Sequence, residues 1–292
     1  MSTYLDICNA NQTKPKNTGF NDQCIESKLN IPVISNGFKF PTVESFKTVA
    51  DWKAAIKAKN IVPLFPVFEL ADASTEDTKF ESGTFSKVTS KGVEKITFEC
   101  YLSVCAYAAL KSYENLGTYA ELFEYNEDGD YSGMYDTDGV KVKGRKITSV
   151  KVTRIRATKD KVPYVKGEIT FADKDDVLNA VIVKSDLTET DLEGIFDVQL
   201  KQISATSTSI RFTASAGCTG GGTLISSLTM PDIVVKNSAG AVQTVSLVSP
   251  GIDEVYELTG TGFANGHTVS LNGVIQQTTI MYESPDPLIV SI

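Results

Sequence analysis

Histidine, tryptophan and paired cysteines are scarce in this sequence. Its 292 residues include one His, one Trp and five Cys, and no C-x-x-C pair occurs. A structural zinc site needs four Cys or His ligands, which usually come from close pairs, so the pattern argues against zinc. We interpret the scattered cysteines as reduced thiols. The single histidine, His267, lies in the turn-like segment 264–267, and we expect a solvated loop side chain rather than a catalytic base.

Motifs for enzymatic chemistry are also missing. The chain has no G-x-S-x-G, no G-x-x-x-x-G-K and no dinucleotide fingerprint. The glycine-rich run 217–222 lacks a lysine, and we interpret it as a strand connection. Many carboxylates are present, but nothing selects a glycosidase pair among them. We therefore predict no enzymatic activity, no catalytic residue, no cofactor and no bound metal, and we keep a glycosidase-like enzyme as the weakest alternative.

Long apolar runs are absent as well. No stretch approaches the roughly 18–20 apolar residues of a membrane span, and the first residues, MSTYLDICNANQ, show no basic region leading into an apolar core. We expect no membrane partner, no signal peptide, and synthesis in the cytoplasm.

Alternating apolar and polar residues dominate what is present, and they predict a mainly β fold. We expect an extended N-terminal arm over 1–40, with little core of its own. Helices are expected from a capping box at Thr48–Asp51 and over 101–115. Strands over 80–88 and 93–99 are expected to form a hairpin that turns at Lys91-Gly92.

Further strands follow the second helix. Val150, Val152 and Ile155 are expected to lie on a long strand, with a bulge because the alternation slips by one, and Tyr164–Phe171 is expected to form the next strand. Residues 173–183 fit a short helix or a strand equally well. Near residue 200, Gly, Ser and Thr become more frequent and short strands recur, which is typical of a small sandwich. We therefore predict a β-rich body with two helices over 41–199 and an immunoglobulin-like domain over 200–292.

Residues 124–144 are rich in glycine and acidic side chains. An EF-hand starting at Asp128 would place Gly139 where a bidentate carboxylate is required, and no helices flank the segment. Asp128-Gly129 and Asp138-Gly139 are strong hairpin signals instead. We expect projecting acidic hairpins that contact other subunits or line a lumen. Their candidate residues are Glu124, Glu127, Asp128, Asp130, Asp136 and Asp138.

Charge is distributed in blocks. The net charge of −8 combines an acidic region over 69–138, a basic region over 141–166 and a second acidic region over 168–197. Such blocks suit a subunit that binds copies of itself, but they equally suit strands that pair their charges within one molecule. The basic block could also bind phosphates. The candidate basic interface residues are Lys141, Lys143, Arg145, Lys146, Lys151, Arg154 and Arg156.

The C-terminal part resembles a known domain type. Leu258-Thr-Gly-Thr-Gly-Phe263, followed by Val269-Ser-Leu-Asn-Gly273, is similar to the G-x-G-F…V-x-x-x-G signature of TIG/IPT-type immunoglobulin-like domains. This resemblance implies that the glycines allow tight turns and that Phe263 fills the sandwich core.

The body resembles structural proteins of tailed bacteriophages. Segments 62–68, 74–77 and 108–113 are similar to the major tail tube subunits of these phages. The resemblance implies a helix-flanked β-sandwich or barrel whose copies stack as rings, some with an added immunoglobulin-like domain outside. It also implies a virion location, an acidic bore that passes DNA without specific binding, and contacts with other tail proteins. The long arm departs from the minimal pattern of the family.

Together these observations predict a virion structural protein, and a tail tube subunit in particular. The alternatives that stay open are another virion component, such as a capsid decoration or tail-terminator protein, and a surface- or carbohydrate-binding module. The four aromatic residues Phe212, Tyr256, Phe263 and Tyr282 of the C-terminal part are few for stacking on sugars.

Overall fold

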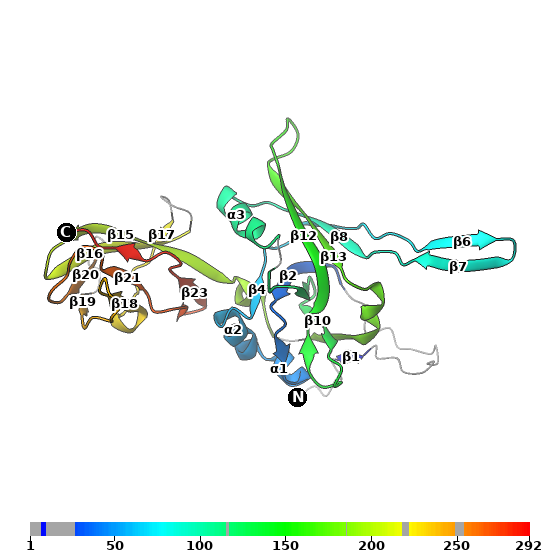
Figure 1. The fold of residues 1–292 in the computed structure, drawn as a ribbon, viewed down its shortest axis with the longest axis horizontal. Coiled ribbons are helices and arrows are strands. Elements are labelled where there is room, and N and C mark those ends of the chain that lie inside the picture. Colours follow the sequence, from blue (N-terminus) through cyan, green and yellow to red (C-terminus); the bar gives the residue numbers. More distant parts are fainter. Residues whose placement is uncertain (1–6, 10–26, 115–116, 185, 218–221, 249–253) are drawn as a thin grey trace. The chain divides into compact units, whose positions relative to one another are not determined.

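A computed structural model describes residues 7–9, 27–114, 117–184, 186–217, 222–248 and 254–292 (Figure 1). The chain divides into two compact units, Met1–Glu193 and Gly194–Ile292, which we call unit 1 and unit 2. The division falls a few residues ahead of the expected boundary near Gln199, because β15 (Ile195–Ala205) pairs wholly within unit 2.

Strands dominate both units, which confirms the prediction of a mainly β protein. They hold 46% of the residues and helices hold 14%, whereas average globular domains have roughly 20–25% strand and 30–35% helix. Among the described residues, no helix is long and apolar enough to cross a membrane.

Unit 1 is built on one large sheet, with a separate two-stranded hairpin. The described residues of the large sheet form twelve strands. They are β1 (Ile7–Asn9), β2 (Leu29–Ser35), β3 (Lys39–Phe40), β4 (Ile61–Pro63), β5 (Glu69–Asp72), β8 (Lys95–Cys100), β9 (Glu121–Asn126), β10 (Asp130–Tyr135), β11 (Val142–Lys143), β12 (Arg145–Ile155), β13 (Tyr164–Phe171) and β14 (Ala180–Lys184). Along its main path the order is β1-β14-β10-β9-β12-β13-β8-β5.

Residues 29–40 belong to this core rather than to an arm. β2 pairs with β4 and β9, and five of its last six residues are buried. Phe40 is fully buried. Asn30, Pro32 and Ser35 interrupt the apolar pattern of this segment. For that reason the sequence predicts an extended arm here rather than a core strand. Residues 1–6 and 10–26 of the expected arm lie outside the described residues.

Helices cover opposite faces of the sheet. Leu122 and Phe123 are neighbours on β9 and therefore point to opposite sides. Leu122 belongs to a cluster with Leu110 of α3 (Val104–Ser112). Phe123 packs 5.6 Å, between ring centroids, from Phe46 of α1 (Val43–Lys47) and from Trp52 of α2 (Val49–Lys57). The sheet is thus buried on two sides, as a sandwich-like body requires.

The predicted capping box at Thr48–Asp51 is wrong, although α2 begins where it was expected. The Thr48 hydroxyl donates to the Glu44 carbonyl, and the Asp51 carboxylate accepts from the Ser45 hydroxyl. Both side chains are engaged by α1, a short helix that the sequence analysis missed. The helix expected over 101–115 is shorter, because Ser103 caps its first turn.

The expected hairpin over 80–99 is also wrong. β6 (Thr78–Ser82) pairs with β7 (Phe85–Ser90), whereas β8 joins the main sheet between β13 and β5. The turn occurs at Gly83, whose φ of +60° favours glycine. Gly92 serves a close approach instead, since a Cβ there would lie 1.9 Å from the carbonyl oxygen of Thr75.

The expectations for residues 145–183 hold in their main features. β12 and β13 pair from Ile147 to Ile155, and a bulge is present, but it lies between Ile147 and Ser149, whereas the slip in alternation had predicted it between Val152 and Ile155. Gly167 of β13 leaves room for the ring of Phe98 on β8, because a Cβ would lie 2.1 Å from that ring. The ambiguous segment contains both structures in turn, a 3-10 helix over Lys174–Asn179 and then β14.

Unit 2 is a small sandwich of two sheets. Its larger sheet contains β15, β16 (Ser209–Ala216), β17 (Thr223–Leu224), β19 (Ser246–Val248), β20 (Tyr256–Thr259), β22 (Ile275–Gln277) and β23 (Ile280–Glu283). Its smaller sheet contains β18 (Ile233–Lys236), β21 (Thr268–Leu271) and β24 (Leu288–Ile289). Apolar side chains of the two sheets form one core cluster.

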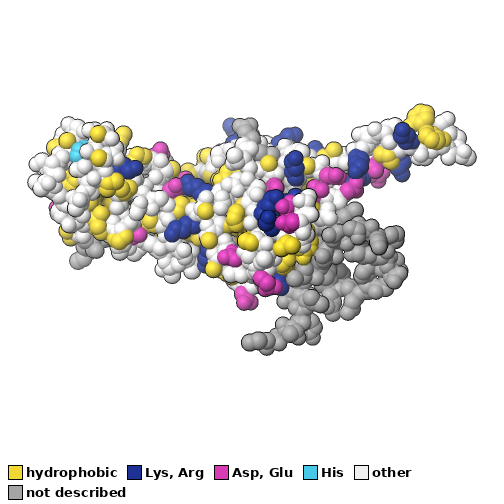
Figure 2. Space-filling view, turned by 60° about the horizontal axis from the view of Figure 1, so that its bottom comes forward, with side chains coloured by type: hydrophobic (Ala, Val, Ile, Leu, Met, Phe, Trp, Pro, Cys, Tyr) yellow, Lys and Arg dark blue, Asp and Glu magenta, His cyan; other side chains and the backbone are white. Residues whose placement is uncertain are grey.

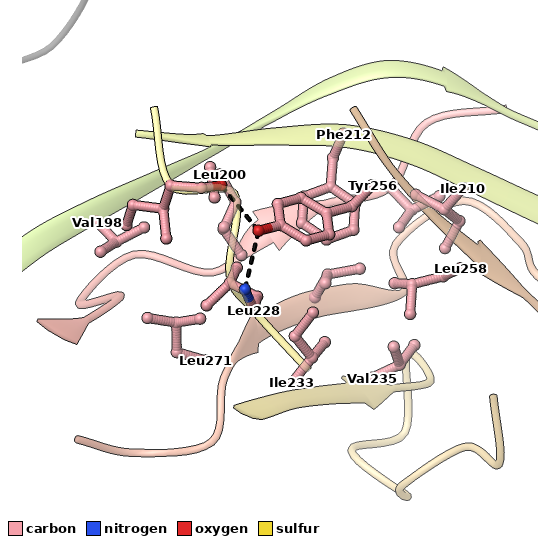
Figure 3. Packing of buried hydrophobic residues seen from close by; sticks show 14 of the residues in the cluster. Val198, Leu200, Ile210, Phe212, Leu228, Ile233, Val235, Tyr256, Leu258 and Leu271 are labelled. Carbon is pink, nitrogen blue, oxygen red and sulfur yellow. Dashed lines mark hydrogen bonds between the residues drawn. The ribbon is translucent and has the colours of Figure 1, made fainter. Parts of the chain in front are cut away.

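Tyr256 organises this core (Figure 3). Its ring stacks on Phe212, with 5.4 Å between centroids. Its hydroxyl donates to the Ile225 carbonyl at 2.8 Å and accepts from the Leu228 N–H at 2.9 Å. Tyr256 therefore fixes the connection at 225–228 against the buried face of the larger sheet.

Two expectations about single residues need correction, and one is met. His267 is buried rather than solvated, with 6% of its surface exposed beside the ring of Phe263. Phe263 itself is buried in the core, as the resemblance implied. Cys100 is a free buried thiol whose pKa burial raises to about 12. Cys105 is disulfide-bonded, so the prediction of reduced thiols is wrong for that residue.

We expect Tyr256→Phe to lower the local stability of unit 2 by about 1–3 kcal/mol, because it leaves the buried N–H of Leu228 without an acceptor. Hydrogen exchange of the full chain, followed by mass spectrometry, measures this at residues 225–228 and in β20. Tyr282→Phe is the matched control, since the hydroxyl of Tyr282 bonds to no other described residue. Equal exchange in the two variants would contradict the assignment.

Candidate functional site

The acidic stretch forms turns between strands, as the sequence predicted. Asp128-Gly129 connects β9 to β10, and Asp138-Gly139 connects β10 to β11. Both glycines have positive φ values, +78° and +69°, which such turns require. The Asp138 carboxylate accepts the backbone N–H groups of Val140 and Lys141 and so fixes the second turn.

Most of the acidic candidates bind cations within unit 1. Asp136 lies 2.6 Å from the Lys39 ammonium and 3.2 Å from that of Lys143, and only 10% of its side chain is exposed. Asp130 is also buried, 3.7 Å from Lys184. The other contacts are Glu127 with Lys28 and Asp138 with Lys141. Asp128 is exposed and Glu124 is half-buried on β9.

The environment of Asp136 is a small charged cavity of about 500 Å³. The hydrogen bond from Lys39 is the main reason why the pKa of Asp136 lies well below its usual value. Burial raises the pKa of the neighbouring Glu121, and the positive charges of Lys143 and Lys39 oppose that rise only in part. The cavity thus contains carboxylates and ammonium groups that compensate one another.

The basic block separates into a paired part and an exposed part. Arg145 donates to both carboxylate oxygens of Glu94, at 2.6 and 2.5 Å, and its guanidinium lies 4.1 Å from the centroid of Phe171. Lys151 lies 3.7 Å from Glu168. Lys146, Arg154 and Arg156 are exposed and make no ion pair with another residue in the described part of the chain.

These contacts bear on the two interpretations of the charge blocks. Pairing within one molecule accounts for Lys141, Lys143, Arg145 and Lys151. It does not account for Arg154, Arg156 and Lys159, which lie where β12 and β13 extend beyond the rest of the sheet (Figure 1). We call residues 154–163 the basic tip; its cations are Arg154, Arg156, Lys159 and Lys161, its one acid is Asp160, and all but the half-buried Ile155 are exposed.

A second projecting element, the β6–β7 hairpin, was missed by the sequence analysis. Every residue of its two strands is exposed. Phe80, Phe85 and Val88 are 55%, 56% and 44% exposed. Figure 2 shows hydrophobic side chains at the end of this arm and acidic ones along its base. The signal in the sequence was Glu81-Ser82-Gly83-Thr84 between Phe80 and Phe85, since a polar run with a glycine between two apolar residues marks a turn.

Among the described residues, no group of three or more His, Cys, Asp or Glu side chains could hold a metal ion. No protein-family model, no curated protein and no solved structure matches this chain.

We expect Asp136→Asn to destabilise unit 1 near neutral pH and to leave it less sensitive to acid. Folding favours the ionised Asp136, so its contribution is complete above its unfolded pKa of about 3.9 and declines as the pH falls toward the depressed folded value. Melting temperatures measured from about pH 7 down to about pH 2 should therefore converge for wild type and variant.

The control is Asp128→Asn, which makes the same chemical change at the exposed β9–β10 turn and should leave the melting temperature nearly unaltered at all pH values. A constant difference between wild type and Asp136→Asn over the whole pH range would contradict the assigned role of Asp136.

Proposed function

We propose that this chain is a structural subunit that assembles with copies of itself, and that it is a tail tube protein of a tailed bacteriophage. In this proposal the β body of unit 1 forms stacked rings, DNA passes through them without specific binding, and other tail proteins of the virion bind the ends of the tube. Unit 2 is an immunoglobulin-like domain on the outside.

The observation that carries the proposal is the β6–β7 hairpin. An isolated two-stranded hairpin is marginally stable in water at best. This one also exposes two phenylalanines and a valine, whose burial is worth roughly 1.5–3 kcal/mol each. A hairpin of this kind gains most of its stability when a partner covers it.

A second copy of the chain is the partner that a structural role supplies. Homo-oligomers are the commonest oligomers, and head-to-tail contacts between identical subunits close into rings or extend into filaments. A hairpin that leaves the body as β6–β7 does suits a contact of this kind, because it joins a surface of one copy to a different surface of the next. The mainly β body agrees with a tube of stacked sandwich-like subunits.

The acidic lining of the proposed bore would come from exposed residues. Asp130 is buried, Asp136 is half-buried, and both lie against lysines, so they would support the β10 hairpin rather than face DNA. Glu127, Asp128 and Asp138 are exposed and remain the acidic candidates of this region.

Carbohydrate binding by unit 2 is less well supported. Stacking on a sugar needs an exposed aromatic face, but Phe212, Tyr256 and Phe263 are buried in the core. A capsid decoration or tail-terminator protein would share the self-assembly and would differ in forming knobs or caps.

We expect the purified full chain to form rings or tubes in negative-stain electron microscopy, and Phe80→Ser/Phe85→Ser to remain monomeric in sedimentation velocity. The substitutions remove the exposed aromatic surface of the β6–β7 hairpin and disturb no core, because both side chains are more than half exposed.

Val140→Ser/Val242→Ser is the matched control, since it removes two other exposed apolar side chains, 55% and 66% exposed, outside this hairpin. The control should assemble like wild type. A wild-type protein that stays monomeric at high concentration would refute the proposed function, and caps or knobs in place of tubes would favour the other virion components.

A further inference from the structure

The cations of the basic tip outnumber the acids that lie around it in the described part of the chain. Its four cations face one acid, Asp160, and only Lys161 approaches a carboxylate outside the tip, Glu99 at 4.0 Å. Arg154, Arg156 and Lys159 make no ion pair with any other described residue. The tip is nevertheless ordered, since Lys161 donates its N–H to the Thr158 hydroxyl and Thr158 donates its N–H to the Lys161 carbonyl.

A mostly unpaired acidic segment begins at the edge strand β5 and continues through a loop into β6. We call residues 69–81 the acidic edge; its acids are Glu69, Asp72, Glu76, Asp77 and Glu81, and its one cation is Lys79. Asp77 binds Lys174, but Glu69, Glu76 and Glu81 are exposed and make no ion pair within the described part of the chain. β5 pairs with β8 on one side, so it is an edge strand.

The acidic edge also contains a repulsive contact. Glu69 of β5 lies directly opposite Glu99 of β8, and like charges in that position destabilise a strand pair. One carboxylate oxygen of Glu99, Oε2, is buried without a hydrogen bond. Two lysines of the same molecule offset this repulsion in part, since Lys166 of β13 lies directly opposite Glu99 and the Lys161 ammonium lies 4.0 Å from Glu99 Oε2. Glu69 is exposed and makes no ion pair in the described part of the chain, so a cation from another copy would act on Glu69.

We propose that the basic tip of one copy binds the acidic edge of another copy. The inference rests on the proposed function and names the surfaces of its inter-subunit contact. Arg154, Arg156 and Lys159 carry three positive charges. Glu69, Glu76 and Glu81 carry the same number of negative charges. The two surfaces belong to different elements of unit 1. A copy that gives its tip to one neighbour and its edge to another makes a head-to-tail contact, which propagates from copy to copy.

A nucleic acid is the competing partner for the basic tip. The chain as a whole is acidic, with a net charge of −8, and residues 69–138 before the basic block and 168–197 after it carry most of the excess. This field repels a polyanion at long range but still lets an acidic protein surface of the right shape dock at short range. An acidic surface of a second copy is therefore favoured.

A charge-swap experiment tests the contact. Variant A is Arg154→Glu/Arg156→Glu/Lys159→Glu, and variant B is Glu69→Lys/Glu76→Lys/Glu81→Lys. We expect each variant alone to form no rings or tubes. The fraction of oligomer in sedimentation velocity should fall at least tenfold below that of wild type. We expect an equimolar mixture to regain assembly, because the acidic tip of A fits the basic edge of B and the basic tip of B fits the acidic edge of A.

The control is Lys201→Glu/Arg211→Glu/Lys236→Glu. It changes the net charge by the same amount as variant A, but on exposed residues of unit 2, and should assemble like wild type. Recovery in the mixture also shows that both variants are folded. Assembly of variant A alone, or no recovery in the mixture, overturns the tip-to-edge contact and leaves the proposed function intact.

Two further outcomes separate the alternatives. A wild-type protein that forms no oligomer removes the proposed function and the contact together. Retention of a duplex DNA probe by wild type at physiological salt, lost in variant A, overturns the contact in favour of phosphate binding. Oligomers that dissociate as the salt concentration rises support it, because exposed charges are screened.

Discussion

The pairing of β12 with β13 is the interaction on which the rest of the molecule depends. Its inner half is held in the core, where Val150, Val152 and Val165 are buried. Gly167 completes it by admitting the ring of Phe98 from β8. Only because this half is anchored can the outer half extend past the sheet and present cations to solvent. A free hairpin of the same sequence would not keep its strands paired.

The same logic applies to the other projecting element. β5 and β8 carry the chain out of the main sheet, and β6 and β7 continue it as a ribbon that buries nothing. The two exposed ribbons add no core of their own. The stability of unit 1 comes from the aromatic cluster under α1 and α2 and from the cluster under α3. The division between a packed sheet and exposed ribbons is the structural basis of our proposal that the chain assembles with copies of itself.

Charge is arranged along the same division. Near the sheet, lysines and arginines meet carboxylates of their own molecule, and Arg145 is fixed by two hydrogen bonds to Glu94. On the ribbons, Arg154, Arg156, Lys159 and Glu81 are exposed and make no ion pair with another described residue. Electrostatic energy near the core therefore orients strands within the subunit, whereas the charges on the ribbons are available for specificity between subunits.

The sequence by itself determined the β character, the strand pair after residue 144 and the turns at Asp128-Gly129 and Asp138-Gly139, because these depend on local alternation and on glycine. It could not identify the partners of β8, because the residues of Lys95–Cys100 fit pairing with the preceding strand as well as pairing with β13. Nor could it tell the half-buried, ion-paired Asp136 from the exposed Asp128, because ion pairs between residues such as Lys39 and Asp136 join segments far apart in the chain. Only the tertiary structure decided which charged side chains form ion pairs within the subunit and which form none among the described residues.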